Sequence, residues 1–210
     1  MTQLQNDYDA LFIGVGTYRS MKAGIPHEDA PGVYDALPFL VANTRNVMGL
    51  DPAADEPFID TQGLNVVVLG GGDTAMDCVR TALRHGAAKV TCAYRRDEAN
   101  MPGSKKEVKN AKEEGAAFEF NLQPVELTLD AYGKVNGIRM LRTRLGEPDA
   151  QGRRRPVPVA GSEFVMPADA VIMAFGFNPH AMPWLQAQGV DTDDWGRIRA
   201  SVEKIGRAHV

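Results

Sequence analysis

The sequence has little cysteine and no long apolar run, and both shortages narrow what the protein can be. Only two cysteines occur, Cys78 and Cys92, and they do not form a CxxC pair. We therefore expect neither a disulfide framework nor an iron–sulfur site in this chain, and a reducing cytoplasm is the expected location. The four histidines show no metal-ligand spacing, so no metal site is predicted. No apolar run reaches the roughly 20 residues that span a bilayer, so no membrane contact is expected.

The sequence also has fewer basic residues than acidic residues. The 23 Lys and Arg residues are outnumbered by 27 Asp and Glu residues, which gives a formal net charge of -4. Without a strong positive field, nucleic acid is not an expected partner. Hydrophobic residues make up 44% of the 210 residues, which is enough for one sizeable core, or for one domain with part of a second.

Beyond Gly63, apolar strands and amphipathic helices alternate along the chain. The segments "LNVVVLG" (64–70), "AKVTCAYRR" (88–96) and "AAFEFNL" (116–122) predict strands, with a helix after each of the first two. This order predicts an α/β fold, a Rossmann-like parallel sheet of right-handed units. The period of two that follows from residue 124 predicts an antiparallel β-meander, and "ADAVIMAFG" (168–176) predicts a return to a buried parallel strand.

The region before Gly63 is predicted to be less regular. "YDALFIGVGT" (8–17) is typical of a buried strand that ends in a glycine turn. An amphipathic helix is predicted within residues 33–50, and a polar linker follows it. We place a domain boundary near Gly63.

The segment "GGGDTA" (70–75) fits the pattern G-x-G-x-x-A between a strand and a helix. Gly70 permits the tight turn, Gly72 keeps a Cβ out of the path of a phosphate, and Ala75 lets the helix pack close to the strand. The free N–H groups and positive dipole end of the helix favour an anion there. This context predicts a dinucleotide pyrophosphate site, although an ordinary turn remains an open alternative.

Polar side chains in this first helical turn also predict a cap that needs no ligand. Asp73 or Thr74 can accept a hydrogen bond from the first turn, and Asp77 lies three residues after Thr74, as in a capping box. Capping is sufficient to explain Asp77.

Arginines at the end of the second strand favour one cofactor over another. An NAD site places an acidic residue about 20 residues after the glycine turn, where it binds the ribose hydroxyls. This chain has Arg95 and Arg96 there instead, and guanidinium groups bind a phosphate bidentately. The pair therefore predicts NADPH, whereas a solvated arginine pair on a surface loop is the alternative.

Several segments together resemble a known family. "VVVLGGGDTAMDCVRTALRHGA", "VTCAYRRDEANMPGSKKEVKNAKEEG" and "PADAVIMAFGFNPH" are similar to the small (beta) subunit of NADPH-dependent glutamate synthase. That subunit is one of the two-dinucleotide-binding, pyridine nucleotide-disulfide-oxidoreductase-like flavoproteins. The resemblance implies that the protein passes hydride from NADPH to FAD, with electrons moving on through iron–sulfur clusters to the large (alpha) subunit for glutamate synthesis.

The resemblance also implies an organisation of domains. Residues 1–20 are expected to be a remnant of an FAD-binding domain, 21–62 a linker helix region, and 63–174 the NADPH-binding domain. Residues 175–198 are expected to return to the FAD domain, and 199–210 depart from the family pattern and are expected to be a non-native tail.

Cofactor contacts are carried over residue by residue, and no catalytic side chain is implied. Glu107 corresponds to an acid that contacts the ribose in related reductases, although a solvated helix glutamate is an open alternative. The residues expected to bind cofactor are the pyrophosphate loop Gly70, Gly71, Gly72, Asp73 and Thr74; the 2′-phosphate pair Arg95 and Arg96; Glu107; and, near the flavin, Gly16, Thr17 and Gly176.

The chain departs from the family in ways that leave its acceptor open. It lacks the cysteine clusters, the first glycine fingerprint and the closing Gly-Gly-Asp, so we expect a fragment that binds NADPH but is not a reductase alone. One alternative is the same module serving a dihydropyrimidine dehydrogenase-like or a ferredoxin–NADP reductase-like enzyme. Another is a non-catalytic nucleotide-binding module.

Overall fold

A computed structural model describes residues 2–53, 57–148, 150, 152, 154–180 and 182–199. The chain divides into two compact units. One unit combines the residues up to 19 with those from 177 onward, and the other contains residues 20–176. The larger unit carries the predicted nucleotide-binding segments.

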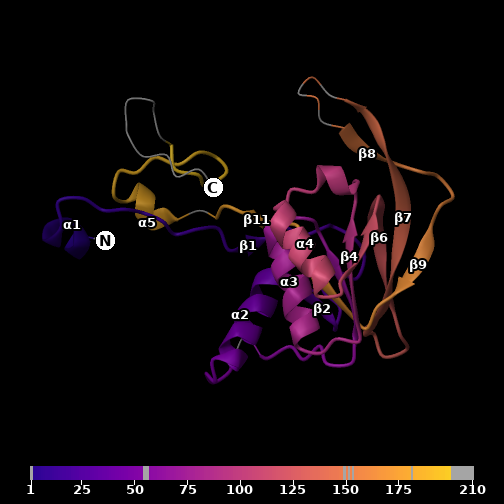
Figure 1. The fold of residues 1–210 in the computed structure, drawn as a ribbon. Helices are drawn as coiled ribbons and strands as arrows, with labels where there is room; N and C mark the ends of the chain where they lie inside the picture. The colour runs from indigo at the N-terminus through magenta and orange to yellow at the C-terminus, as the bar shows by residue number, and fades with distance from the viewer. Residues whose placement is uncertain are drawn as a thin grey trace. The chain divides into compact units, whose positions relative to one another are not determined.

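A five-stranded sheet, to which the labelled strands β2 and β4 in Figure 1 belong, forms the centre of the larger unit. All of its neighbouring strands are parallel. The strand order is β2-β10-β3-β4-β5. The strands are β2 (Val33–Asp35), β10 (Ala170–Met173), β3 (Asn65–Leu69), β4 (Lys89–Tyr94) and β5 (Ala117–Phe120). The predicted Rossmann-like parallel sheet is therefore confirmed.

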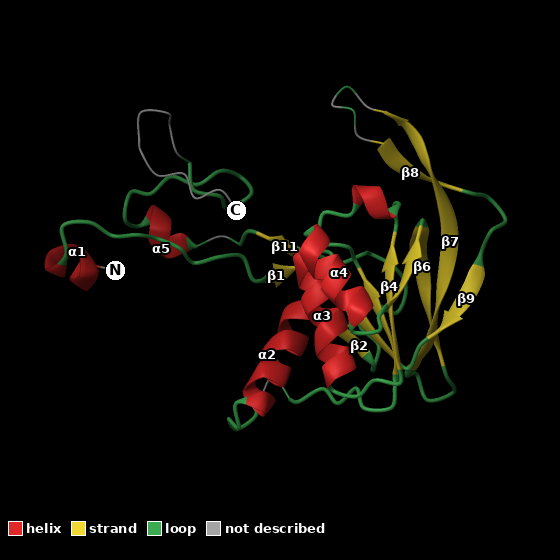
Figure 2. Cartoon of the chain, in the orientation of Figure 1, coloured by secondary structure: helices red, strands yellow, loops and turns green. Residues whose placement is uncertain are grey.

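Three helices lie on one face of this sheet (Figure 2). They are α2 (Ala36–Val47), α3 (Asp73–Arg84) and α4 (Lys105–Glu113), and a short 3-10 helix (Glu98–Asn100) precedes α4. Val66 and Val68 of β3 pack against the helices, whereas Val67 and Leu69 point to the opposite face. The strand is apolar at every position because both of its faces are covered.

An antiparallel sheet covers the opposite face of the parallel sheet. Its strands are β6 (Leu122–Leu129), β7 (Val135–Pro148), β8 (Arg154–Pro158) and β9 (Phe164–Pro167), and both β8 and β9 pair with β7. Leu127 and Ile138 of this sheet share a core with Val67. The predicted antiparallel meander is confirmed.

The boundary predicted at Gly63 does not separate compact units. Residues 20–62 belong to the larger unit, β2 pairs in register with β10, and Phe39 of α2 is fully buried in the helix-side core. The region expected to be a linker helix region, 21–62, contains the predicted helix as α2, and it also supplies an edge strand of the sheet. A strand of three residues is too short to show a periodicity, so no local pattern predicts β2.

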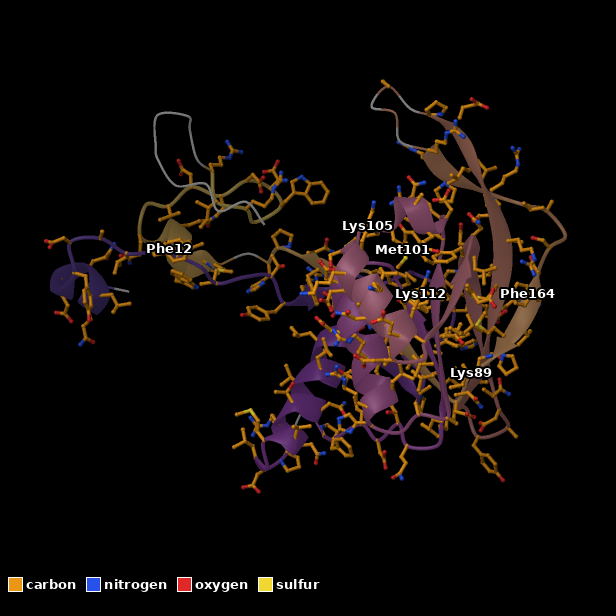
Figure 3. The ribbon with its side chains drawn as sticks, in the orientation of Figure 1. Phe12, Lys89, Met101, Lys105, Lys112 and Phe164 are labelled. Carbon is orange, nitrogen blue, oxygen red and sulfur yellow. The ribbon has the colours of Figure 1, made fainter. Side chains whose placement is uncertain are left out.

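The buried strand predicted at residues 8–17 is wrong. No strand lies there, and Phe12, labelled in Figure 3, is 93% exposed. A strand needs a neighbour for its N–H and C=O groups, and this segment pairs with none of the described residues. A short apolar run alone does not distinguish a buried strand from an exposed extended chain.

The smaller unit contains few regular elements. These are α1 (Thr2–Asp7), α5 (Pro183–Gln186) and β11 (Phe177–Asn178). The partner strand of β11 is β1 (Arg19–Ser20), of which only Arg19 is assigned to this unit. Its assignment to an FAD domain stays a prediction. Of the tail predicted at 199–210, only Arg199 lies within the described residues. Across the described chain, the helices are too short or too polar to cross a membrane.

Candidate functional site

A pocket of about 490 Å³ opens where three strands of the parallel sheet end, inside the larger unit. Its walls include the residues that follow β3, β4 and β10, namely Gly70–Gly72, Arg95–Arg96 and Ala174–Gly176. Ligands of open α/β sheets bind at the carboxyl ends of the strands, and a pocket of this size accommodates a cofactor fragment. The predicted glycine turn and the arginine pair therefore meet in one pocket.

Two glycines of the turn are required by close packing. Gly70 has φ of +146°, and a Cβ there would lie 2.2 Å from the carbonyl oxygen of Ala174. A Cβ on Gly71 would lie 2.6 Å from the ring of Tyr94. The turn is thus held between β10 on one side and the end of β4 on the other, and side chains at these positions would force these elements apart.

The third glycine leaves open space for a ligand. A Cβ built on Gly72 meets no atom within 4 Å, and Gly72 is the N-cap of α3, with extended backbone angles. The backbone N–H groups of Asp73 and Thr74 find no acceptor among the described residues. These free donors and the positive end of the helix dipole fit an anionic group such as a pyrophosphate.

The predicted side-chain cap of α3 is wrong. Helix α3 begins at Asp73, so neither Asp73 nor Thr74 occupies the N-cap, and Gly72 has no side chain to accept a hydrogen bond. The Asp73 carboxylate instead accepts a 2.7 Å hydrogen bond from the backbone N–H of Ser104. Asp77 makes no capping hydrogen bond, and partial desolvation of its carboxyl together with the charge of Glu107 raises the pKa of that carboxyl.

The backbone of the arginine pair is held by hydrogen bonds from β7 and from the residue between β5 and β6. The carbonyl of Arg95 accepts a hydrogen bond from the Thr143 hydroxyl, and that of Arg96 accepts one from the Asn121 N–H. Both arginines follow β4 directly and line the pocket, as their position in the sequence predicts. The Arg96 guanidinium donates two hydrogen bonds, of 3.0 and 2.8 Å, to the hydroxyl of Tyr94.

Glu107 is not part of the pocket wall. It lies in the first turn of α4, and its carboxylate accepts a 2.6 Å hydrogen bond from Arg80 of α3. Neither the ribose role nor a freely solvated side chain is needed to explain it, because the ion pair with Arg80 joins the two helices. Its expected ribose contact stays a prediction.

The three glycine and threonine positions expected near the flavin are divided between the two units. Gly176 lines the pocket, adopts φ of +97° and accepts a hydrogen bond from the Met21 N–H. Gly16 and Thr17 belong to the smaller unit, and their flavin contact stays a prediction. Among the described residues, no group of three or more His, Cys, Asp or Glu side chains could hold a metal ion.

Part of the pocket wall was not predicted from the sequence. Residues 21–23, 25 and 122–124 line it, and they come from the start of the larger unit and the start of β6. No motif marks them, because they reach the pocket only through tertiary packing. Near the pocket, the cap of the predicted helix after β4 had a marker that was not used: "SKKE" at 104–107 has the S-x-x-E pattern of a capping box, and the Ser104 hydroxyl accepts a hydrogen bond from the Glu107 N–H. Figure 3 labels Lys105, the first residue of α4, and Met101, which precedes that helix in the sequence.

The fold and the pocket together define a dinucleotide-binding α/β protein. The model of the family described as pyridine nucleotide-disulphide oxidoreductase matches residues 2–205. The chain belongs to that family.

Curated relatives are similar over almost the whole chain. It is 79% identical, over 97% of its length, to a putative oxidoreductase, AegA, of Escherichia coli strain K12, and spans 31% of that protein. It is 62% identical, over 95% of its length, to the small chain of NADPH glutamate synthase from the same strain, and spans 42% of it. The resemblance to the glutamate synthase small subunit is confirmed, and the chain spans less than half the length of these relatives.

Solved structures support the fold. FprA of Mycobacterium tuberculosis, in a structure described as a complex with NADPH, aligns with a TM-score of 0.71. The alignment covers 95% of this chain and 57% of FprA at 20% sequence identity. At this identity the similarity concerns the fold alone.

Proposed function

We propose that this chain is the NADPH-binding portion of a flavin-dependent reductase. One observation carries the proposal. The N-terminus of α3, where the N-cap Gly72 has no side chain, lies in the same pocket as Arg95 and Arg96. The helix end fits the pyrophosphate, and the arginines fit the 2′-phosphate that distinguishes NADPH from NADH. A relative named for NADPH, 62% identical to this chain, supports the same cofactor.

The residues of this chain bind and orient the nucleotide in this proposal. FAD, bound by the whole protein, supplies the chemistry of hydride acceptance. The main-chain N–H groups of Asp73 and Thr74 hold the pyrophosphate, and the arginine pair fixes the adenosine end. No side chain of the pocket is required as a general acid or base.

Iron–sulfur chemistry is assigned to parts of the whole protein outside this chain. Cys78 is buried in the helix-side core, and the buried Cys92 thiol donates a 3.3 Å hydrogen bond to the Gly70 carbonyl. Neither thiol is placed to ligate a cluster.

The physiological acceptor has two candidates. The first is the glutamate synthase large subunit, as the 62% identity to a glutamate synthase small chain supports. The second is a different acceptor for the same module, and two observations favour it. The 79% identity is to a protein named a putative oxidoreductase, and an NADPH-Fe(3+) oxidoreductase subunit of Geobacter sulfurreducens is 40% identical over 94% of the chain.

Titration of the chain with NADPH and NADH tests the nucleotide assignment. Arg95→Ala and Arg96→Ala should each weaken NADPH binding by about 1.5–3 kcal/mol and change NADH binding far less. Arg154→Ala removes an exposed arginine of β8 that does not line the pocket, and it should change neither affinity. Equal losses for both nucleotides in the Arg95 and Arg96 variants would exclude a 2′-phosphate site.

Two further measurements separate the functional alternatives. In the whole protein, anaerobic addition of NADPH should bleach the flavin absorbance. If the whole protein contained no flavin, the non-catalytic nucleotide-binding module would be the supported alternative. Glutamate formation on mixing the reduced protein with a glutamate synthase large subunit would support the first acceptor. Flavin reduction without glutamate formation would support the second.

A further inference from the structure

The hydroxyl of Tyr94 connects the end of β4 to the arginine pair. It accepts hydrogen bonds from Nε and Nη2 of Arg96 at 3.0 and 2.8 Å, and it donates one of 2.9 Å to the carbonyl of Asn100. The Arg96 guanidinium carbon also lies 5.7 Å from the centre of the Tyr94 ring. One hydroxyl therefore fixes both the position and the plane of the Arg96 guanidinium.

Tyr94 is itself held in place on several sides. It is only 7% exposed, and its ring lies against Gly71 of the glycine turn. The Asn100 carbonyl that it contacts belongs to a 3-10 helix whose N-cap, Asp97, accepts hydrogen bonds from the Asn100 N–H and side-chain amide. The acceptor of Arg96 is therefore a rigid group.

The hydrogen bonds to Tyr94 leave one edge of the guanidinium available. Five N–H donors belong to an arginine side chain, and the contacts with Tyr94 use one on Nε and one on Nη2. The remaining donors, on Nη1 and Nη2, form the terminal edge that binds a phosphate bidentately. Arg96 lines the pocket, so that edge is available to a ligand there.

Arg95 differs from its neighbour in this respect. Its side chain is exposed and makes no hydrogen bond or ion pair with the described residues, although its backbone is held by Thr143. Ordering a free arginine side chain on binding costs conformational entropy, and a side chain already held by the protein avoids much of that cost. Arg96 is therefore the preorganised member of the pair.

We infer that Tyr94 is a positioning residue that holds Arg96 ready for the 2′-phosphate and thereby sets the preference for NADPH over NADH. The inference rests on the proposed function and adds the source of its specificity. Tyr94 acts through Arg96, and the nucleotide contacts the arginine.

A double-mutant cycle on the 210-residue chain tests this inference. Dissociation constants for NADPH and NADH are measured for the unmodified chain, Tyr94→Phe, Arg96→Ala and the double variant. Phenylalanine keeps the ring against Gly71 and removes only the hydroxyl. We expect Tyr94→Phe to raise the Kd for NADPH about three- to tenfold and the Kd for NADH less than about twofold, the cost of one or two hydrogen bonds.

Dependence on Arg96 is the decisive part of the cycle. In the Arg96→Ala background, Tyr94→Phe should leave the Kd for NADPH unchanged, because no guanidinium remains to be oriented. The matched control is Tyr132→Phe, since Tyr132 is 94% exposed in the β6–β7 turn and should affect neither nucleotide. An unchanged or improved NADPH affinity in Tyr94→Phe would overturn the inference, as would an equal effect with and without Arg96.

A second variant serves if Tyr94→Phe fails to fold. Arg96→Lys keeps the positive charge but cannot offer the hydroxyl two donors from a planar edge, so it should lower the NADPH preference by a similar factor. Full preference in Arg96→Lys would contradict the inference. A loss of NADPH affinity in Arg96→Ala without one in Tyr94→Phe would refute this inference alone. An unmodified chain that does not prefer NADPH would overturn the proposed function and, with it, this inference.

Discussion

The backbone N–H of Ser104 donates a 2.7 Å hydrogen bond to the carboxylate of Asp73, and this contact joins the starts of α4 and α3. Beside it, the Gly103 N–H donates to the Gly71 carbonyl at 2.9 Å. The carboxylate next to the glycine turn is thus directed at the N-terminal end of another helix, where its negative charge is favourable. Asp73 ties the loop before α4 to the glycine turn.

Replacement of Asp73 should loosen that loop. We expect Asp73→Ala to lower the free energy of unfolding by about 1 kcal/mol, the value of one hydrogen bond to a charged acceptor at an exposed site. Thermal or denaturant unfolding measures the change. Asp77→Asn is the control on the same helix. Because Glu107 and burial disfavour the charge of Asp77, its loss should not destabilise the protein. Equal destabilisation by both variants would contradict the proposed contact.

The three glycines of the turn should differ in what they tolerate. Gly70→Ala should cost about 2–4 kcal/mol of stability, because it combines an unfavourable φ with a clash against the Ala174 backbone. Gly72→Ala should leave stability within about 0.5 kcal/mol, since its Cβ meets open space. Isothermal titration should nevertheless show weaker NADPH binding by Gly72→Ala, because the added methyl group occupies the phosphate's space. Full NADPH affinity in a folded Gly72→Ala protein would place the phosphate elsewhere.

Ion pairs between α3 and α4 should make stability depend on acidic pH. Arg84 and Arg80 donate hydrogen bonds to Glu114 and hold the pKa of its carboxyl below the ordinary 4.5. A carboxyl with a depressed pKa stabilises the fold above about pH 4.5, and this contribution is lost as the pH falls through the folded-state value. Glu114→Gln should therefore destabilise by about 1 kcal/mol at pH 7, with the difference vanishing near pH 2.

The neighbouring glutamate provides the comparison for this pH dependence. Glu113 is 64% exposed, and its carboxylate lies 3.6 Å from Lys109. An exposed ion pair of this kind contributes little to the free energy of unfolding. Melting temperatures of Glu113→Gln should follow those of the unmodified chain from pH 2 to 7. If the melting temperature of Glu114→Gln showed the same dependence on pH as that of Glu113→Gln, the ion pairs of Glu114 would not contribute to stability.

Both cysteines should resist thiol reagents while the protein is folded. Burial raises the pKa of the Cys92 thiol to about 12 and also raises that of Cys78, whose second cause is the charge of Asp77. Fewer than one thiol per chain should react with Ellman's reagent at pH 8, and two should react in guanidinium chloride. The folded state holds these protons more tightly, so stability should fall as the pH rises above about 9. Rapid labelling of the folded chain would contradict the burial of the thiols.

The parts of the fold with strong local periodicity were predictable. The run Val66–Leu69 faces two cores and therefore has no polar position, which is typical of a central parallel strand. The meander was predicted because its strands alternate in polarity. By contrast, β2 has three residues, and the segment around Phe12 shows an apolar run without a partner strand. A local sequence pattern does not show which strands pair, so β2 was not predicted and the segment around Phe12 was wrongly predicted to be a strand.

The candidate site divides in the same way. The residue types of the glycine turn and of Arg95 and Arg96 predict an NADPH site, because each group has a chemical match in the cofactor, and the structure brings both groups into one pocket. The roles of Asp73 and Glu107 were not predictable, since a carboxylate at a helix start fits a cap, a ligand or an ion pair equally well. Their partners, Ser104 and Arg80, are 31 and 27 residues away in sequence.

The sequence by itself determined the α/β class, the order of strands and helices beyond Gly63, and the chemistry of the turn and the arginine pair. These features depend on local spacing and on residue type. Only the tertiary structure decided that residues 20–62 complete the sheet, that Gly71 packs on Tyr94, and that Tyr94 holds Arg96. These are contacts between separate elements, whose geometry arises when the strands pair and the helices pack upon them.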